Sequence, residues 1–472
     1  MSNRRLLAIW LICALSYIPF LFSVQFTGEE AIYSLIPFEM STSGRFLEPT
    51  IYGEAYRRPP LLNWLVIALA EVAGWDGTLT YLRLISSASS ILSSALVFLL
   101  LRSQVGLTFN HALLGSVLYI ICWQVLGGYG WKGYSDALFG FFVFSSLVFA
   151  WLAIERSSSV GWILLSVLAC FFAFLTKAVT SYFFLLAFLF AYILLCSPAI
   201  RPRVFLVSIS VVLSGLLVVG WYQLTPFGSM MASGATFDIF DRFTTGSFID
   251  FFANAINFSG ETYLNFFPVS LILTFLWIKQ RSFNSGTTWG NVAGLAALLN
   301  FLPYAFTSHT HSRYLMPLYG LVAIYCLALY LRHRAEITEN IVWRPIVLVV
   351  LLKLLFSAGL FQWYTEMKRP NLEELSSQVI TIADGRRIYS TDESWIGISV
   401  SDLINRSRVQ QGFITKDFER SQDFVLLSRF PLASLGVPVL TYRDEFFVYC
   451  GGTGITGLTC PKSTVFFKGS LQ

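Results

Sequence analysis

Long apolar runs recur along this 472-residue chain, and they restrict its possible folds more than any other feature. Runs of roughly 20 residues are long enough to cross the ~30 Å hydrocarbon layer of a bilayer as helices. Charged residues make up only 12% of the chain, about half of the ~25% usual in soluble domains. The sequence therefore predicts an all-α polytopic membrane protein with about eleven transmembrane helices. The expected spans are Leu6–Phe26, Leu82–Leu101, Ala112–Leu126, Ala137–Ile154, Val160–Leu175, Val179–Cys196, Phe205–Tyr222, Tyr263–Ile278, Val292–Phe306, Tyr314–Leu331 and Ile346–Trp363.

The Lys and Arg residues of the short loops predict the orientation of the chain. With the N-terminus inside, every inside loop is basic, as the positive-inside rule requires. An odd number of spans then places the C-terminal tail outside. The net charge of +5 is mostly explained by the inside loops, so nothing in the composition indicates nucleic-acid binding.

Composition changes sharply at residues 366–370, which predicts two regions. Residues 1–364 are expected to form the membrane domain, with a first outside loop at 27–80, and residues 365–472 a small water-soluble α/β domain. A capping-box pattern at residues 390–393 precedes a predicted helix at Trp395–Leu403. Strand-like runs lie at Gln378–Ala383, Phe424–Ser428, Val439–Tyr442, Glu445–Tyr449 and Thr464–Phe467.

Two of the seven cysteines stand apart from the apolar runs. Cys450 and Cys460 both fall in the predicted outside tail, where they could close a small disulfide loop in an oxidising compartment. Two unpaired thiols are the alternative.

The first outside loop is the richest in charge. Glu29 and Glu30 directly follow the first span, where charge is costly, so they are functional candidates. Helical spacing would put Tyr33 on the same face as Glu30. Arg58 precedes Pro59-Pro60, which open a short apolar helix at the interface, and a cation beside a helix N-terminus suits a lipid phosphate. Plain solvation of the loop and an anchoring arginine are the structural alternatives.

A glycine-rich and aromatic-rich outside turn covers residues 127–136. Asp136 begins the next span, where an unpaired carboxylate would be expensive, so we expect a partner cation or a hydroxyl-rich ligand. Aromatic rings such as Tyr134 form platforms for sugar faces, although they also serve as an interfacial belt.

Single cations occupy two further outer turns, against the positive-inside trend. Lys177 follows the fifth expected span, and Arg313 precedes Tyr314 at the tenth. Both are interpreted as phosphate-binding residues. His309 and His311, two residues apart, are weak metal candidates, because that spacing alone does not define a site.

Six segments in chain order resemble motifs of a known family. They are Glu29–Tyr33, Tyr56–Leu65, Tyr81–Leu84, Asp136, Phe174–Lys177 and Ser312–Tyr319. In these segments the chain is similar to the GT-C fold integral-membrane glycosyltransferases of bacteria, specifically the aminoarabinose (lipid A) transferase and protein O-mannosyltransferase-like family.

The resemblance implies an enzyme of the bacterial inner membrane with a cytoplasmic N-terminus and a periplasmic C-terminal domain. It would transfer a sugar from a polyprenyl-phosphate (undecaprenyl-phosphate-type) donor to lipid A, another glycan or a protein. It implies three groups of site residues: catalytic Glu29, Glu30 and Asp136; donor-phosphate-binding Arg58, Lys177 and Arg313; and substrate-binding Tyr33, Tyr56, Arg57, Tyr134 and Tyr314.

Two departures from the family pattern affect what the resemblance implies. Glu29 replaces a leading Asp, and Arg57-Arg58 replace a Glu-Lys pair. In the lipid A enzymes that Glu helps to bind a divalent metal, so a metal stays open here. The substitutions also suggest a different sugar or acceptor.

Two other classes remain open. A transporter or flippase of lipid-linked saccharides would share the spans and the cations, but it should carry central ionisable residues within its spans, of which few, such as Lys353, are seen. A polymerase or ligase of surface polysaccharide should carry its large outer loop later in the chain.

Overall fold

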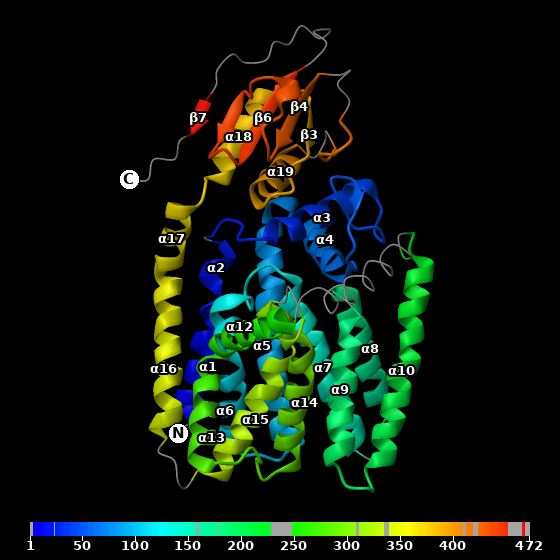
Figure 1. Cartoon of the computed structure of the whole chain (residues 1–472), viewed down its shortest axis with the longest axis vertical. Helices are drawn as coiled ribbons and strands as arrows, with labels where there is room; N and C mark the ends of the chain where they lie inside the picture. Colours follow the sequence, from blue (N-terminus) through cyan, green and yellow to red (C-terminus); the bar gives the residue numbers. More distant parts are fainter. Residues whose placement is uncertain are drawn as a thin grey trace. The chain divides into compact units, whose positions relative to one another are not determined.

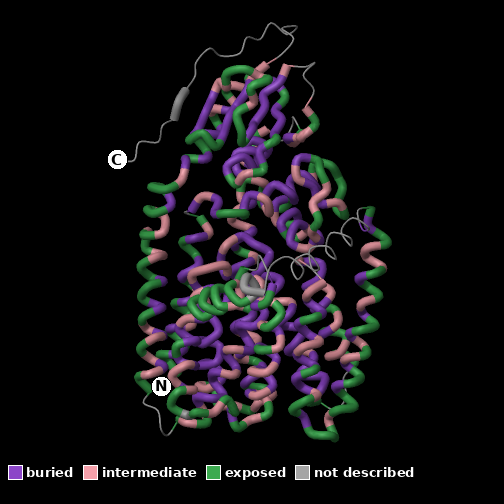
Figure 2. The backbone as a smooth tube through the Cα atoms, viewed as in Figure 1, coloured by how far each residue is buried: buried purple, intermediate pink, exposed green. Residues whose placement is uncertain are grey.

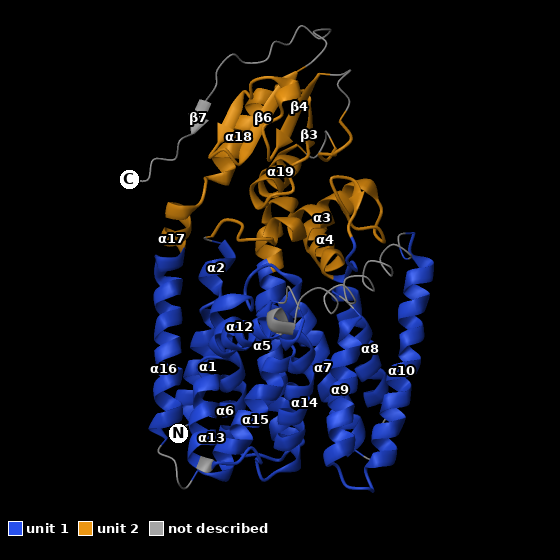
Figure 3. Cartoon of the chain, viewed as in Figure 1, with its two compact units in different colours: residues 1–22, 57–61, 83–361 blue, residues 23–56, 62–82, 362–472 orange. Residues whose placement is uncertain are grey.

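The computed structural model describes residues 3–22, 24–156, 160–177, 179–226, 228, 248–307, 311–334, 339–408, 412–418, 423–451 and 465–467 (Figure 1). The chain forms two compact units, which Figure 3 shows in different colours. The first unit consists of Met1–Phe22, Arg57–Leu61 and Arg83–Phe361. The second consists of Ser23–Tyr56, Leu62–Leu82 and Gln362–Gln472.

The first unit is a bundle of apolar helices. It contains α1 (Asn3–Leu15), α2 (Ile18–Phe22), most of α5 (Thr78–Ser103), α6 (Phe109–Ile120), α7 (Ser135–Glu155), α8 (Val160–Thr176), α9 (Thr180–Leu195), α10 (Arg201–Leu224), α12 (Phe248–Asn265), α13 (Val269–Gln280), α14 (Thr288–Ala305), α15 (Leu318–Arg332) and α16 (Asn340–Leu355).

Helix α7 is the most enclosed of the long apolar helices. It packs against α8, α9, α10 and α15, and its apolar window is 83% buried, compared with 28% for α10. Figure 2 shows this contrast between the two helices. An apolar exterior on α10 is expected for a helix that faces lipid, because lipid chains solvate leucine as well as a protein core does. The site candidate Asp136 therefore lies on the most protected of these helices.

Five helices of the described residues are long and apolar enough to cross a membrane, or six if the bent pair α12–α13 is one span. Helices α6, α8, α9 and α15 are also apolar but shorter. Several of the expected spans are thus present as apolar helices, and the total of eleven stays a prediction. The expected single span Tyr263–Ile278 is wrong, because α12 and α13 meet at 104°. Pro268 at this break lacks an N–H and disfavours helix in the preceding residue.

The tail in the second unit contains a five-stranded sheet with the order β3-β4-β6-β5-β7. Its strands are β3 (Arg387–Ser390), β4 (Phe424–Ser428), β5 (Leu440–Tyr442), β6 (Phe446–Gly451) and β7 (Val465–Phe467), and its helices are α17 (Phe361–Lys368), α18 (Leu372–Ala383) and α19 (Trp395–Ser407). Strand β4 pairs parallel with β3 and antiparallel with β6, while β5 pairs antiparallel with β6 and parallel with β7.

Two local predictions for the tail are wrong, and β3 was not expected. The run Gln378–Ala383 is the end of α18 rather than a strand. The buried positions of α18, Leu372, Leu375, Val379 and Ala383, follow a helical period. A window of six residues is too short to distinguish this period from the alternating pattern of a strand. The N-cap of α19 is Ser394, whose side chain accepts a hydrogen bond from Gly397 N, rather than Ser390. The other four strand-like runs coincide with β4 to β7 within one or two residues.

The first outside loop belongs with the tail rather than with the helical bundle. It contains α3 (Glu30–Ser43), the hairpin β1 (Thr50–Ile51) and β2 (Glu54–Ala55), and α4 (Leu61–Ala73). Ala31 and Leu35 of α3 share one hydrophobic core with Val379 and Val425 of the tail. The predicted division into 1–364 and 365–472 differs from these units, because the apolar side of α3 is buried by residues more than three hundred positions later.

A buried carboxylate organises the hairpin of this loop. Glu39 of α3 is fully buried and accepts hydrogen bonds from Thr50 Oγ1 (2.7 Å), Tyr52 N (2.7 Å) and Gly53 N (3.1 Å). Burial raises the pKa of Glu39 to about 7, although these three donors oppose the shift. Glu39 therefore has a structural role at the turn of the hairpin.

Candidate functional site

The glycine-rich turn before α7 is anchored by a buried tryptophan. Residues Gln124–Gly128 form one π-helical turn, and Trp131 follows with only 1% of its surface exposed. Its ring packs on Phe20, with centroids 4.4 Å apart, and its indole N–H donates to the carbonyl oxygen of Gly127 (3.1 Å). From α5, Ser90 Oγ donates to the carbonyl oxygen of Gly130 (2.8 Å). The turn is therefore held in one conformation from both sides.

Gly130 is required by a close approach within this turn. A Cβ at this position would lie 2.0 Å from the carbonyl oxygen of Val125. We expect Gly130→Ala to destabilise the protein by about 1–3 kcal/mol, as overpacking does elsewhere, and to lower the unfolding midpoint measured by tryptophan fluorescence in detergent. Gly215→Ala on α10 is the matched control, because a Cβ there meets nothing within 4 Å. Equal midpoints for the two variants would contradict this account of the turn.

Asp136 and Lys177 form a buried ion pair. Asp136 lies in the first turn of α7, and Lys177 lies in the turn that follows α8. Their side chains are 1% and 10% exposed. Burial lowers the pKa of Lys177 to about 8, the Asp136 carboxylate opposes this shift, and the charges of Arg58 and Arg313 add to it. Lys177 is therefore the partner cation that the position of Asp136 led us to expect.

Arg313 lies among three tyrosine rings. It is carried by the short 3-10 helix η3 (Ser312–Leu315) and is 9% exposed. Its Cζ lies 5.4 Å from the ring centroid of Tyr129, 5.2 Å from that of Tyr134 and 5.6 Å from that of Tyr314. Such contacts stabilise a partly desolvated cation by about 0.5–2 kcal/mol. The predicted substrate tyrosines Tyr134 and Tyr314 thus enclose a predicted phosphate-binding arginine.

The ring of Tyr314 connects the two cationic residues. Lys177 Nζ lies 4.1 Å from its centroid, on the same ring that Arg313 contacts. Arg58 is partly buried and close enough to depress the pKa of Lys177. Three cations and one carboxylate therefore gather here, and the positive surplus of these four groups suits an anionic ligand such as a phosphate. Arg57, by contrast, is exposed.

Sequence reasoning missed a polar network behind Arg313. Ser312 Oγ donates to the carboxylate of Glu261 (2.6 Å) and accepts from Asn265 Nδ2 (2.6 Å) and Gln124 Nε2 (3.3 Å). Because Ser312 precedes Arg313, this network ties η3 to α12 and to the π-helical turn. The sequence did contain a signal for this network: Glu261 and Asn265 are four positions apart and therefore share one face of a helix.

In the second unit, the two neighbouring carboxylates differ in surroundings. Glu30 is fully buried, and its Oε2 accepts from Thr27 N (2.7 Å) and Thr27 Oγ1 (3.0 Å), as the glutamate of a capping box does. Glu29 is exposed, and Tyr33 and Tyr56 are partly buried. Glu30 is therefore committed to the start of α3, whereas Glu29 presents its carboxylate at the surface.

The tail holds the segment that carries Glu29. Arg369 donates to the carbonyl oxygen of Phe26 (2.5 Å), and the guanidinium of Arg406 lies 5.5 Å from the Phe26 ring. Arg406 also pairs with Asp402 (2.8 Å), which accepts from Ser34 Oγ of α3 (3.0 Å). The position of Glu29 within its unit thus depends on residues of the C-terminal tail.

The structure does not assign a role to the predicted metal candidates or to the two cysteines of the tail. Among the described residues, no group of three or more His, Cys, Asp or Glu side chains could hold a metal ion. His311 is exposed and contacts Tyr314 (5.9 Å between ring centroids), while His309 lies outside the described residues. Cys450 belongs to β6 and Cys460 also lies outside the described residues, so their disulfide stays a prediction.

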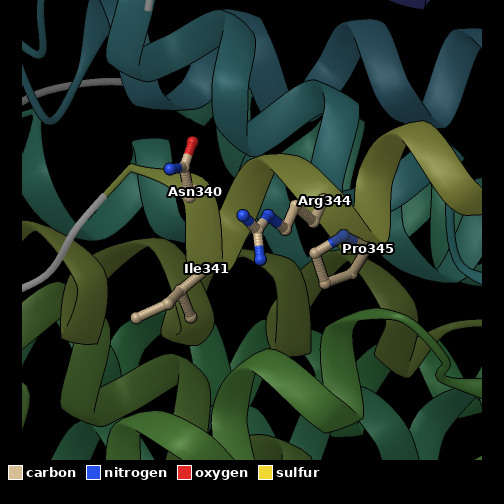
Figure 4. A pocket seen from close by; sticks show the side chains of 4 residues that line it. All are labelled: Asn340, Ile341, Arg344 and Pro345. Atoms are coloured by element: carbon tan, nitrogen blue, oxygen red, sulfur yellow. The ribbon is translucent and has the colours of Figure 1, made fainter.

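A separate pocket of about 350 Å³ lies at the start of α16. It is lined by Asn340, Ile341, Arg344 and Pro345 (Figure 4). The described residues that line it include one guanidinium and one amide but neither a carboxylate nor a tyrosine. The residues that suit transfer chemistry therefore gather around Asp136 and not here.

No family model matches the chain, and no curated protein matches it significantly. Two solved structures of ArnT from Cupriavidus metallidurans do match it. The structure with bound undecaprenyl phosphate has a TM-score of 0.72 and 15% identity, and the match covers 95% of this chain and 98% of ArnT. The structure in the apo state has a TM-score of 0.69 and 16% identity, with 97% and 98% covered. The GT-C fold expected from the order of the motifs is confirmed.

Proposed function

We propose that this protein with the GT-C fold is a glycosyltransferase that moves a sugar from a polyprenyl-phosphate donor to an acceptor of the bacterial cell envelope. The observation that carries the proposal is the Asp136–Lys177 ion pair beside the tyrosine-enclosed Arg313. The fold similarity supports it, because ArnT was solved with undecaprenyl phosphate. The reaction takes place at the extracytoplasmic face of the inner membrane, in the orientation that the basic loops predict.

The cations around Asp136 bind the phosphate of the donor. A carrier phosphate bears one negative charge while the sugar is attached and gains a second when the sugar leaves. Arg58, Lys177 and Arg313 are in place before that charge develops, so they stabilise the transition state more than the bound donor. Asp136 holds the ammonium of Lys177 in position within the buried pair.

Glu29 acts on the acceptor. An acceptor oxygen attacks the anomeric carbon of the sugar, the bond between that carbon and the phosphate oxygen breaks, and the proton of the acceptor hydroxyl passes to the Glu29 carboxylate. Such general-base assistance contributes ~10²–10⁴-fold to a rate. Glu30 supports Glu29 through its capping contact with Thr27. Tyr33, Tyr56, Tyr134 and Tyr314 supply rings for the sugar or the carrier.

We assign no step of this reaction to a divalent metal. Arg57 stands where the related lipid A enzymes carry a metal-binding Glu, and a guanidinium has no lone pair to offer a cation. The exposed Arg57 suits an anionic part of the donor or the acceptor instead. This difference supports a sugar or acceptor other than aminoarabinose and lipid A.

The test combines cells with a purified system. Mass spectrometry of envelope glycolipids, surface glycans and proteins, with and without the gene, should reveal one sugar that disappears from one acceptor. The purified protein in proteoliposomes should then transfer that sugar from a polyprenyl-phosphate donor without a nucleotide sugar. Identical glycan profiles, or movement of the donor across the bilayer without transfer, would refute the proposal and favour a transporter.

A further inference from the structure

We propose that the C-terminal tail contains a second anion site, which binds a phosphate-type oxyanion and lies in a different unit from the cations around Asp136. The site is a pocket formed where α18 ends, β3 begins and α19 ends. It is lined by Arg386, Arg387, Ile388, Ile404, Asn405, Arg408, Gly412, Phe413 and Ile414. This inference goes beyond the proposed transfer reaction and does not depend on it.

Two buried hydrogen-bond donors line this pocket without an acceptor. Arg386 is 4% exposed, and its Nη1 donates to the last carbonyls of α18, at Ile382 (3.4 Å) and Ala383 (3.5 Å). Its Nη2 has no acceptor among the described residues. Nη1 of the guanidinium therefore completes the helix end, and Nη2 is left for an acceptor that the described residues do not supply.

Asn405 repeats the pattern from α19. It is 1% exposed, and its Oδ1 accepts from Ile414 N (3.0 Å). That bond fixes which way the amide is turned, so Nδ2 is directed elsewhere, and Nδ2 has no acceptor among the described residues. Each buried donor without a partner costs about 1–3 kcal/mol. An oxygen-rich ligand between Arg386 and Asn405 would recover both costs at once.

The charge of the lining selects an anion over a water molecule. Arg386, Arg387 and Arg408 bring three guanidinium groups to the pocket, and no carboxylate is among the described residues that line it. Water could accept one hydrogen bond, whereas an anion would also supply negative charge to the guanidinium groups. Guanidinium groups match the tetrahedral oxygens of a phosphate through paired N–H donors.

The size of the pocket limits how the anion enters. The space open to the centres of water-sized spheres is about 30 Å³, and all empty space including the open mouth is about 290 Å³. The first volume corresponds to about two such spheres, so one or two oxygens enter while the rest of the group stays in the mouth. Free phosphate fits this description, and so does a terminal phosphate on the headgroup of a glycolipid at the extracytoplasmic surface of the inner membrane.

The test uses the full chain in detergent and ³¹P NMR titrations with inorganic phosphate and with glucose 1-phosphate. Lys177→Met first removes a cation of the transferase cluster and weakens phosphate binding there, so that the effects of the tail variants are easier to resolve. In that background, Arg408→Gln and Arg386→Lys should each weaken phosphate binding at least about tenfold. Arg386→Lys keeps the charge and removes the planar guanidinium with its paired donors. Arg429→Gln, at an exposed arginine of the tail that does not line the pocket, should leave binding unchanged.

The titrations distinguish a free phosphate ion from a phosphate carried by a glycoconjugate. Tighter binding of glucose 1-phosphate indicates the terminal phosphate of a glycoconjugate, and tighter binding of inorganic phosphate indicates a free anion. Equal binding by the Lys177→Met protein and by its two pocket variants, each with an unchanged unfolding midpoint, would overturn the site. Loss of transfer by Lys177→Met alone bears only on the proposed function.

Discussion

Replacing Glu29 with glutamine should lower sugar transfer by about a hundredfold to ten-thousandfold, with little change in stability. Glutamine has the size of glutamate, but its amide cannot accept the proton of the acceptor hydroxyl. Glu29 is exposed, so its substitution disturbs no packed core. The measurement is the initial rate of transfer from a polyprenyl-phosphate donor in proteoliposomes, together with the unfolding midpoint.

Two other glutamates of the same loop serve as controls for Glu29→Gln. Glu54 is exposed and pairs with Lys416, so Glu54→Gln should keep full activity and lose at most about 1 kcal/mol of stability. Glu30→Gln places an amide group beside the two donors of Thr27 and should lower both stability and activity. Full transfer by Glu29→Gln would refute the catalytic assignment.

Donor binding should weaken as the pH rises through about 8. Burial lowers the pKa of Lys177 to about 8, with Asp136 opposing the shift and Arg58 and Arg313 adding to it. A lipid phosphate binds the protonated ammonium, so affinity is retained below this pKa and lost above it. The apparent KM for the donor, measured over roughly pH 6.5 to 9.5, should therefore increase at the alkaline end.

Variants of Lys177 and Asp136 test whether the pH dependence of donor binding arises from their ion pair. Lys177→Arg keeps its charge throughout this range and should flatten the alkaline limb. Lys177→Met should raise KM at every pH, and it leaves the Asp136 carboxylate buried without its partner. Asp136→Asn removes the charge that supports the protonated form of Lys177, so the limb should move to lower pH. An alkaline limb that is identical in the wild type and Lys177→Arg would assign the titration to another group.

Local sequence signals predicted much of the helical framework. The expected spans at Ala137–Ile154 and Val160–Leu175 correspond to α7 and α8 within two residues at each end, because hydropathy over a window is a property of the chain itself. The prediction was wrong at Tyr263–Ile278, where the hydropathy is continuous but Pro268 accompanies a sharp bend. It was also wrong at Gln378–Ala383, where six residues are too few to separate helical from strand periodicity.

The candidate residues were predicted individually, and their relations were not. Asp136, Lys177 and Arg313 stood out because charge next to an apolar run is costly. Nothing local indicates that Lys177 would neutralise Asp136, that Tyr129, Tyr134 and Tyr314 would enclose Arg313, or that Glu261 would support η3.

The sequence by itself determined the membrane character of the protein, its sharp change of composition near residue 366, and the set of charged residues that mark the proposed site. Only the tertiary structure decided that Glu30 is a buried cap while Glu29 is exposed, and that the first loop shares its core with the tail. The physical reason is the distance along the chain over which each property is set. Hydropathy and charge depend on neighbouring residues, whereas burial and ion pairing depend on partners that folding brings from distant parts of the chain.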